Sequence, residues 1–311
     1  MSGYGEMSRY AAMKRVIAGV LAATLGVGLI GCTAADADRP SVYVTTNILG
    51  DVVSEIVGDH VEVVTLMAPG ADPHSFELSA QQAAGLRDAD LIVANGLGLE
   101  EGLAQHVDAA ADAGVPVALA GDHIDVLEYA AGAGPDPHFW TDPAQMILVV
   151  DALSPLLSDL AGDAHAEVLT AAAEYRALLV ALDEQMGREL SQIPAEDRAL
   201  VTNHHVFGYL ARTYDVTLLG AAIPGGTTLA APSPSDLQEL VDAIDTAGVH
   251  TIFAESSQPD RLVQVLADEA DRDVAVVELI TESLAPPGEP GDTYLDMMHV
   301  NTDRIVKGLS P

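Results

Sequence analysis

Residues 42–67 read VYVTTNILGDVVSEIVGDHVEVVTLM, an alternation of strand-like and helix-like segments. The β-branched run from Val42 to Thr46 predicts a strand, the apolar spacing from Ile48 to Val57 predicts a helix, and the run from Val61 to Met67 predicts a second strand. Repeated β-α units of this size are typical of a parallel sheet covered by helices. This stretch therefore predicts an α/β fold.

The same alternation continues on both sides of a central helical segment. Before that segment, we expect strands at 91–94 and 115–119 and helices at 79–87 and 100–113. After it, we expect strands at 199–202, 216–218, 251–253 and 274–279, and helices at 235–247 and from Asp260 onward. We therefore predict two lobes, residues 41–162 and 194–311, each a parallel sheet flanked by helices.

The segment 163–193 predicts one long helix between the lobes, because apolar residues recur there at steps of three and four. These residues are Val168, Leu169, Ala172, Tyr175, Leu179, Leu182, Met186, Leu190 and Ile193. Asp163 is a suitable N-cap, and Pro194 would end the helix. About 30 residues make a rod of roughly 45 Å. We expect this rod to join the lobes rigidly, although a surface helix of one domain would show the same pattern.

The N-terminus has the pattern of a secretory signal peptide. Basic residues at 9, 14 and 15 precede an apolar stretch at 16–30, which is short for a membrane span. Residues 29–32, LIGC, resemble the bacterial lipobox, in which a lipid is attached to the cysteine. We expect 1–31 to be removed, Cys32 to be lipidated, and 32–40 to tether the protein to the outer face of the cytoplasmic membrane. Cys32 is the only cysteine, so an intramolecular disulfide is excluded.

The chain is strongly acidic, with 13 Lys and Arg against 47 Asp and Glu and a formal net charge of −34. A nucleic-acid partner is not expected, because binding to phosphates needs a basic face. Acidic surfaces of this kind usually reflect solvation.

Three histidines and one carboxylate follow predicted strands at nearly even intervals: His74, His138, His204 and Glu282. Their spacings of 64, 66 and 78 residues are too wide for a local metal-binding loop. Open α/β sheets bind ligands at the carboxyl ends of their strands, so these side chains can converge there. Imidazole and carboxylate suit a borderline divalent ion such as zinc, and four of them complete a tetrahedron.

The other seven histidines are weaker candidates. Five of them, at positions 60, 106, 123, 165 and 250, lie beside Asp or Gly or on polar helix faces, and we expect them at the surface. His205 adjoins His204, and neighbouring side chains diverge, so only one of the two is expected in the site. His299 falls on a predicted C-terminal helix.

Five ordered motifs in this chain resemble a known family. They are 72–77 (DPHSFE), 136–143 (DPHFWTDP), 202–209 (TNHHVFGY), 253–257 (FAESS) and 291–298 (GDTYLDMM) with Asn301. The family is that of the substrate-binding lipoproteins of bacterial zinc and manganese ABC importers, the cluster A-I or TroA-like solute-binding proteins. The resemblance extends from about Ser41 to Leu309.

This resemblance implies two α/β lobes joined by a rigid helix, with one metal ion held between them and delivered to a cognate ABC permease. We expect the protein to be a monomer. Its motifs place ligands at His74, His138 and His204, and a fourth at Glu282, where many relatives have aspartate. The histidine-rich loop of some zinc-specific relatives is missing. Glu255 is a candidate acceptor for the N–H on the ring nitrogen of a ligand histidine that does not bind the metal. Alternatively, Glu255 caps the helix that begins near Pro259.

The leading hypothesis is therefore a metal-binding component of an importer and not an enzyme, with Zn²⁺ favoured and Mn²⁺ as the alternative. Manganese-specific relatives typically supply two acids where this chain has one. A zinc hydrolase with Glu282 as base is a further alternative, since a catalytic zinc keeps one position for water. An adhesin is a third, because relatives have been described as surface adhesins.

Overall fold

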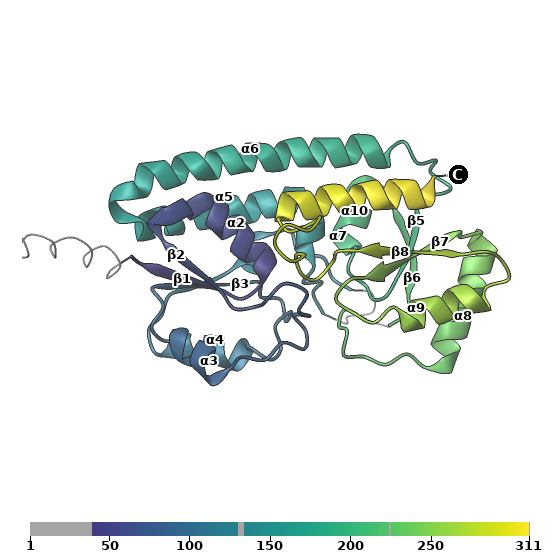
Figure 1. Cartoon of the computed structure of the whole chain (residues 1–311), viewed down its shortest axis with the longest axis horizontal. Coiled ribbons are helices and arrows are strands. Elements are labelled where there is room, and N and C mark those ends of the chain that lie inside the picture. Colours follow the sequence, from purple (N-terminus) through teal and green to yellow (C-terminus); the bar gives the residue numbers. More distant parts are fainter. Residues whose placement is uncertain (1–38, 130–133, 224, 311) are drawn as a thin grey trace, which may run out of the picture. The chain divides into compact units, whose positions relative to one another are not determined.

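The first half of the chain builds a four-stranded parallel sheet (Figure 1). The computed structural model describes residues 39–129, 134–223 and 225–310, so the predicted signal peptide and Cys32 lie outside the described residues. The strand order is β2-β1-β3-β4, and every pairing is parallel. The strands are β1 (Ser41–Val44), β2 (Glu62–Thr65), β3 (Leu91–Ala94) and β4 (Val117–Leu119). The predicted strand positions are confirmed to within two residues at each end.

The second half repeats this arrangement in a separate parallel sheet with the order β6-β5-β7-β8. Its strands are β5 (Ala199–Thr202), β6 (Thr217–Ala221), β7 (Thr251–Glu255) and β8 (Ala275–Leu279). In both sheets the second strand pairs with one edge of the first strand, and the third strand pairs with the opposite edge. The strand order therefore reverses beside β1 and beside β5, and ligands bind at such positions in open α/β sheets.

Helices cover both faces of each sheet, as Figure 1 shows. In the first half, α2 (Asn47–Val57) and α5 (Pro143–Leu160) cover one face, while α3 (Ala80–Gly85) and α4 (Ala104–Asp112) cover the other. Thr46 caps α2 by accepting from the Leu49 N–H, and Ser79 and Gln82 form a capping box on α3. Among the described residues, α5 alone is long and apolar enough to cross a membrane, but half of it is buried in the core.

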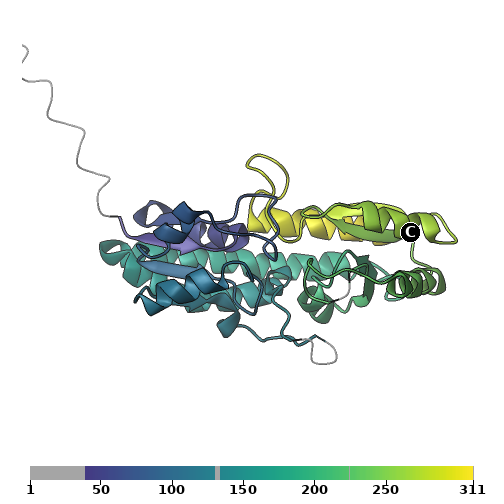
Figure 2. The same cartoon turned by 90° about the horizontal axis from the view of Figure 1, so that it is seen from below.

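In the second half, α8 (Pro234–Ala247) and α9 (Arg261–Glu269) cover one face of the sheet with a separate apolar cluster. The opposite face is covered by α7 (Gly208–Tyr214) and by α10 (Tyr294–Leu309). Figure 2 shows α10 running alongside α6 (His165–Leu190), the long helix between the two halves, and the two helices are in contact.

The linking helix α6 (His165–Leu190) has 26 residues, which makes it about 39 Å long. It is shorter than the predicted 163–193, and two details of the prediction are wrong. Asp163 does not cap the helix, because it lies inside a 3-10 turn, Gly162–Ala164, that reverses the chain after α5. Leu169 is 39% exposed, whereas most of the other periodic residues are buried.

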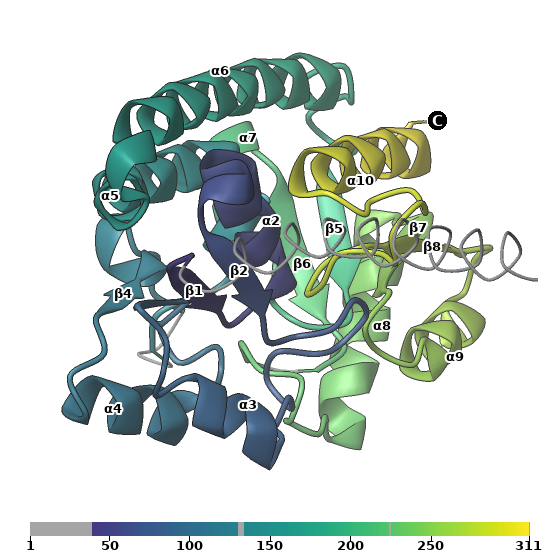
Figure 3. The same cartoon turned by 60° about the vertical axis from the view of Figure 1, so that its left-hand side comes forward.

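One apolar core runs beneath α6 and includes residues from both sheets, for example Val44 and Leu200. It is formed with α2, α5 and α10, all of which contact α6 (Figure 3). The described residues from Pro40 onward consequently form one body, and the two lobes share a core. The helix between the lobes is thus braced along its length on the side that faces the protein.

Candidate metal centre

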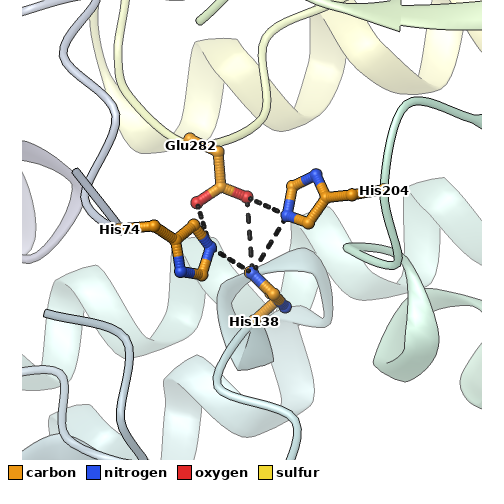
Figure 4. Close-up of side chains that lie close together, drawn as sticks. All are labelled: His74, His138, His204 and Glu282. Atoms are coloured by element: carbon orange, nitrogen blue, oxygen red, sulfur yellow. Dashed lines mark hydrogen bonds and ion pairs between the residues drawn. The ribbon is translucent and has the colours of Figure 1, made fainter. Parts of the chain in front are cut away.

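The four predicted side chains meet at one point, as Figure 4 shows. His74 follows β2, His138 follows β4, His204 lies two residues after β5, and Glu282 lies three residues after β8. One ligand atom from each lies within 4.8 Å of the others. All four residues are buried, with exposed fractions of 0 to 2%. His204 and Glu282 lie directly after strands, whereas His74 and His138 lie on longer loops that follow β2 and β4, and all four side chains point into a common space.

The spacing of the donor atoms fits one small cation. The Nε2 atoms of His74 and His204 lie 3.2 and 3.4 Å from Nε2 of His138. The Glu282 oxygens lie 3.4 to 3.8 Å from the three nitrogens. A tetrahedral ion with bonds of about 2.0–2.1 Å separates its donors by about 3.3–3.4 Å. Both Glu282 oxygens also lack a hydrogen-bond donor among the described residues.

The His138 ring is oriented by a carboxylate two residues earlier. Asp136 Oδ1 lies 2.8 Å from His138 Nδ1 and also accepts from the His138 backbone N–H. The Tyr129 hydroxyl donates to the same oxygen at 3.0 Å. Burial, followed by the nearby Asp136, raises the pKa of Tyr129 above its usual value, so this hydroxyl keeps its proton. With the proton of the ring on Nδ1, the lone pair of Nε2 points into the centre.

His204 is held by a carboxylate from the neighbouring strand. Glu255 Oε1 lies 2.6 Å from His204 Nδ1 and accepts from the His204 backbone N–H at 3.1 Å. Burial alone would lower the pKa of His204, but Glu255 and then Glu282 outweigh it and raise the pKa to about 10. The capping alternative for Glu255 is wrong, because the N-cap of α9 is Asp260 and no side chain bonds there.

His74 is positioned through its backbone. Its N–H donates to Asp72 Oδ1, while its ring Nδ1 has no hydrogen-bond partner among the described residues. Asp72 Oδ2 accepts from Thr228 Oγ1 at 2.7 Å and from Gln258 Nε2 at 2.8 Å, both in the second lobe. Burial lowers the pKa of His74 to about 4, so the ring is neutral at pH 7.

Glu282 remains ionised despite complete burial. Burial alone would raise its pKa, but the three imidazoles, with His138 the largest contributor, outweigh it and lower the pKa to about 2. The centre therefore combines one carboxylate with three imidazole nitrogens in a space closed to solvent.

The remaining histidines stay outside the centre. The five predicted at the surface are exposed: His60, His106, His123, His165 and His250. His205 is half-buried and does not join the four, and its carbonyl oxygen lies 3.0 Å from the Tyr129 hydroxyl oxygen. His299 is half-buried on α10.

Sequence reasoning named Glu255 as an acceptor for a site histidine, and Glu255 does contact His204 Nδ1, but it missed the aspartates that hold the other two histidines. Asp72 and Asp136 each precede a site histidine by two positions in an Asp-Pro-His tripeptide. That repeat could have identified them, since a carboxylate at this distance can accept from the histidine backbone N–H. Asn95 donates to the Pro137 carbonyl and so supports the His138 loop, but no local pattern marks it.

Comparison with known proteins places these features in a family. The profile of the family described as zinc-uptake complex component A, periplasmic (ZnuA), matches residues 42–308. The zinc-binding protein TroA of Treponema pallidum is 32% identical over 96% of this chain and 99% of its own length. The manganese-binding lipoprotein MntA of Halalkalibacterium halodurans is 28% identical over 96% of this chain and all of its own length.

Solved structures agree with the fold. The periplasmic zinc-binding protein TroA of Treponema pallidum superposes with a TM-score of 0.83 at 31% identity, covering 88% of this chain and all of the other. A manganese-bound periplasmic metal-binding protein of Candidatus Liberibacter asiaticus superposes with a TM-score of 0.78 at 25% identity. It covers 87% of this chain and all of that protein.

Proposed function

The chain belongs to the family of the periplasmic zinc-uptake complex component A, and we propose on this premise that it captures one divalent metal ion for an ABC importer. His74, His138, His204 and Glu282 are the proposed ligands. The single observation that carries the proposal is the set of donor-to-donor distances of 3.2 to 3.8 Å. These five donor pairs are spaced like the edges of a tetrahedron around one ion, and all four donor atoms lie within 4.8 Å of one another.

Zinc is the proposed cargo. Three imidazoles and one carboxylate make a nitrogen-rich donor set, and divalent affinity for such sites rises from manganese towards zinc. Manganese prefers shells rich in carboxylate and carbonyl oxygen. Because the named relatives include a zinc-binding protein and a manganese-binding lipoprotein, manganese is the second candidate.

Capture fits this geometry better than catalysis. A catalytic zinc keeps an open position for water, whereas four side-chain donors here surround the centre and each is at most 2% exposed. Glu282 faces the three histidine nitrogens, where a ligand would be, and has no separate position from which to act as a base on water.

The proposal extends to the setting of the protein. Lipidation at Cys32 would hold the chain at the outer face of the cytoplasmic membrane, with 32–40 as a tether. The two lobes, 41–162 and 194–311, would present the bound ion to a cognate permease. Lipoproteins among the relatives support this arrangement.

Native mass spectrometry of the mature chain with equal zinc and manganese tests the proposal. We expect one ion per chain, mainly zinc, and loss of zinc retention in His204→Ala. His250→Ala is the matched control, because His250 is an exposed histidine just before β7. Equal retention of both metals would overturn the zinc assignment, and undiminished zinc binding by His204→Ala would overturn the site.

A further inference from the structure

The segment that carries Glu282 belongs by sequence to the second lobe, yet it is attached to the first. Five hydrogen bonds join residues 281–284 to the first lobe, donated or accepted there by Trp140, Asn47 and Gly70. Trp140 Nε1, for example, donates to the Thr281 carbonyl at 2.8 Å. One residue earlier, Ile280 is bonded to the second lobe, because its N–H donates to Asn301 Oδ1 and its carbonyl accepts from Asn301 Nδ2.

Asn47 is the side chain with the most contacts in this attachment. It is the first residue of α2 and is 7% exposed. Its Nδ2 donates to Ser283 Oγ at 2.6 Å and to the Ala68 carbonyl at 3.3 Å. Its Oδ1 accepts from the Leu284 N–H at 3.0 Å. One amide therefore bonds the two residues that directly follow Glu282 and the loop that leads to His74.

The direction of these bonds is determined by their partners. The Leu284 N–H can only donate and the Ala68 carbonyl can only accept, so the amide has a single consistent orientation. Ser283 Oγ accepts from Asn47 and from the Gly70 N–H, which leaves its own proton for the Leu284 carbonyl. Gly70 reaches this oxygen with φ of 77°, a conformation that favours glycine.

We infer that Asn47 is a positioning residue for the metal, acting through Glu282. This inference rests on the proposed function, because it assumes that Glu282 is a ligand. Asparagine suits the position because its amide supplies a donor and an acceptor on one short, buried side chain. His74, His138 and Glu282 are then all held on the first lobe. The second lobe contributes His204, the fourth proposed ligand, together with Glu255, which holds its ring.

A thermodynamic cycle on zinc affinity tests this inference. Asn47→Ala should raise the zinc Kd by about 10- to 100-fold, the usual effect of removing a group that orients a metal ligand. In a Glu282→Ala background the same change should have less than about a threefold effect, because the carboxylate it orients is gone. Added to His204→Ala, it should keep its full effect, since that ligand is held independently.

A second variant guards against loss of folding. Ser283→Ala removes the atom that Asn47 and Gly70 both bond, and its effect should also vanish in the Glu282→Ala background. Ser154→Ala is the matched control, because this buried serine on α5 donates to the Val150 carbonyl within its own helix, and it should keep the wild-type Kd. Thermal melting of the metal-free proteins identifies any variant that has lost its fold.

The outcomes separate this inference from the proposed function. If the wild type does not retain zinc, the proposed function fails. If Glu282→Ala weakens binding while Asn47→Ala and Ser283→Ala both keep the wild-type Kd, only the role of Asn47 is overturned. A full Asn47→Ala effect in the Glu282→Ala background overturns it as well, because the side chain would then act by another route.

Discussion

Replacing Glu255 by glutamine should change how zinc affinity depends on pH. The amide of the new side chain can still accept from His204 Nδ1, which lies 2.6 Å from the native carboxylate, but it has no charge. In the metal-free protein the raised pKa of His204, about 10, keeps the ring protonated at neutral pH. Zinc must displace that proton from Nε2 before it can bind.

The size of the effect follows from the pKa. With a pKa of about 10, the protonated form of His204 outnumbers the neutral form by about 300 to 1 at pH 7.5. Because zinc binds only the neutral form, the apparent zinc Kd is raised by about the same factor. Since the pKa is raised, the proton is held at every pH below it. The wild-type zinc Kd should therefore rise about tenfold for each unit by which the pH falls from 9 to 6.

The variant combines two opposing changes. Without the Glu255 charge, burial should lower the His204 pKa below its wild-type value. Protons then compete less with zinc for the His204 ring. A less basic ligand binds the metal more weakly, by about 10- to 100-fold. We expect Glu255→Gln to bind zinc more weakly at pH 9 and to lose less affinity on acidification, so that the two curves approach each other at pH 6.

Competition with a chromophoric chelator from pH 6 to pH 9 measures these Kd values, and calorimetry in two buffers counts the released protons. Glu278→Gln is the control, because it removes the same charge from an exposed position on β8. Parallel curves for wild type and Glu255→Gln, or no proton released by the wild type at pH 7.5, would refute the reasoning.

Four other experiments test the rest of the account. Leu179→Ala should lower the free energy of unfolding, measured with denaturant, by about 2–5 kcal/mol, because Leu179 is fully buried where α6 meets the shared core. A decrease below about 1 kcal/mol would show that α6 is loosely packed. Thr228→Val should speed zinc release in a stopped-flow chelator assay, since the hydroxyl ties Asp72 across the lobes, and an unchanged rate would argue against that tie. Cys32→Ser should abolish labelling with fatty acid, whereas persistent labelling at the mature N-terminus would contradict lipidation there. Small-angle X-ray scattering should show a change in radius of gyration on the order of 1 Å or less between the metal-free and zinc-bound protein, because bending a braced helix breaks several backbone hydrogen bonds. A change of several ångströms would mean that the lobes open widely despite α6.

Local sequence patterns were sufficient for the strands and for most of the helices, but not for the bounds of α5 and α7. Strands such as 91–94 and 199–202 have the bounds that their apolar runs predict, since the periodicity of apolar residues reflects burial directly. The long helix was predictable for the same reason, but its first turn was not. Asp163 fits the preference for N-caps, yet the turn after α5 places it inside a helical turn.

The sequence by itself identified the four side chains that converge, because they follow from residue type and from the repeating β-α unit, although it placed His138 nearer a strand end than it is. Only the tertiary structure decided how those donors are held. Asn47 lies 236 residues from Ser283, and Asp72 lies 156 and 186 residues from its partners in the second lobe. No local pattern connects such pairs, because each forms only where packing of the shared core brings distant loops together. For the same reason the sequence could assign Glu282 to the second half of the chain, while its attachment to the first lobe emerged only from the fold.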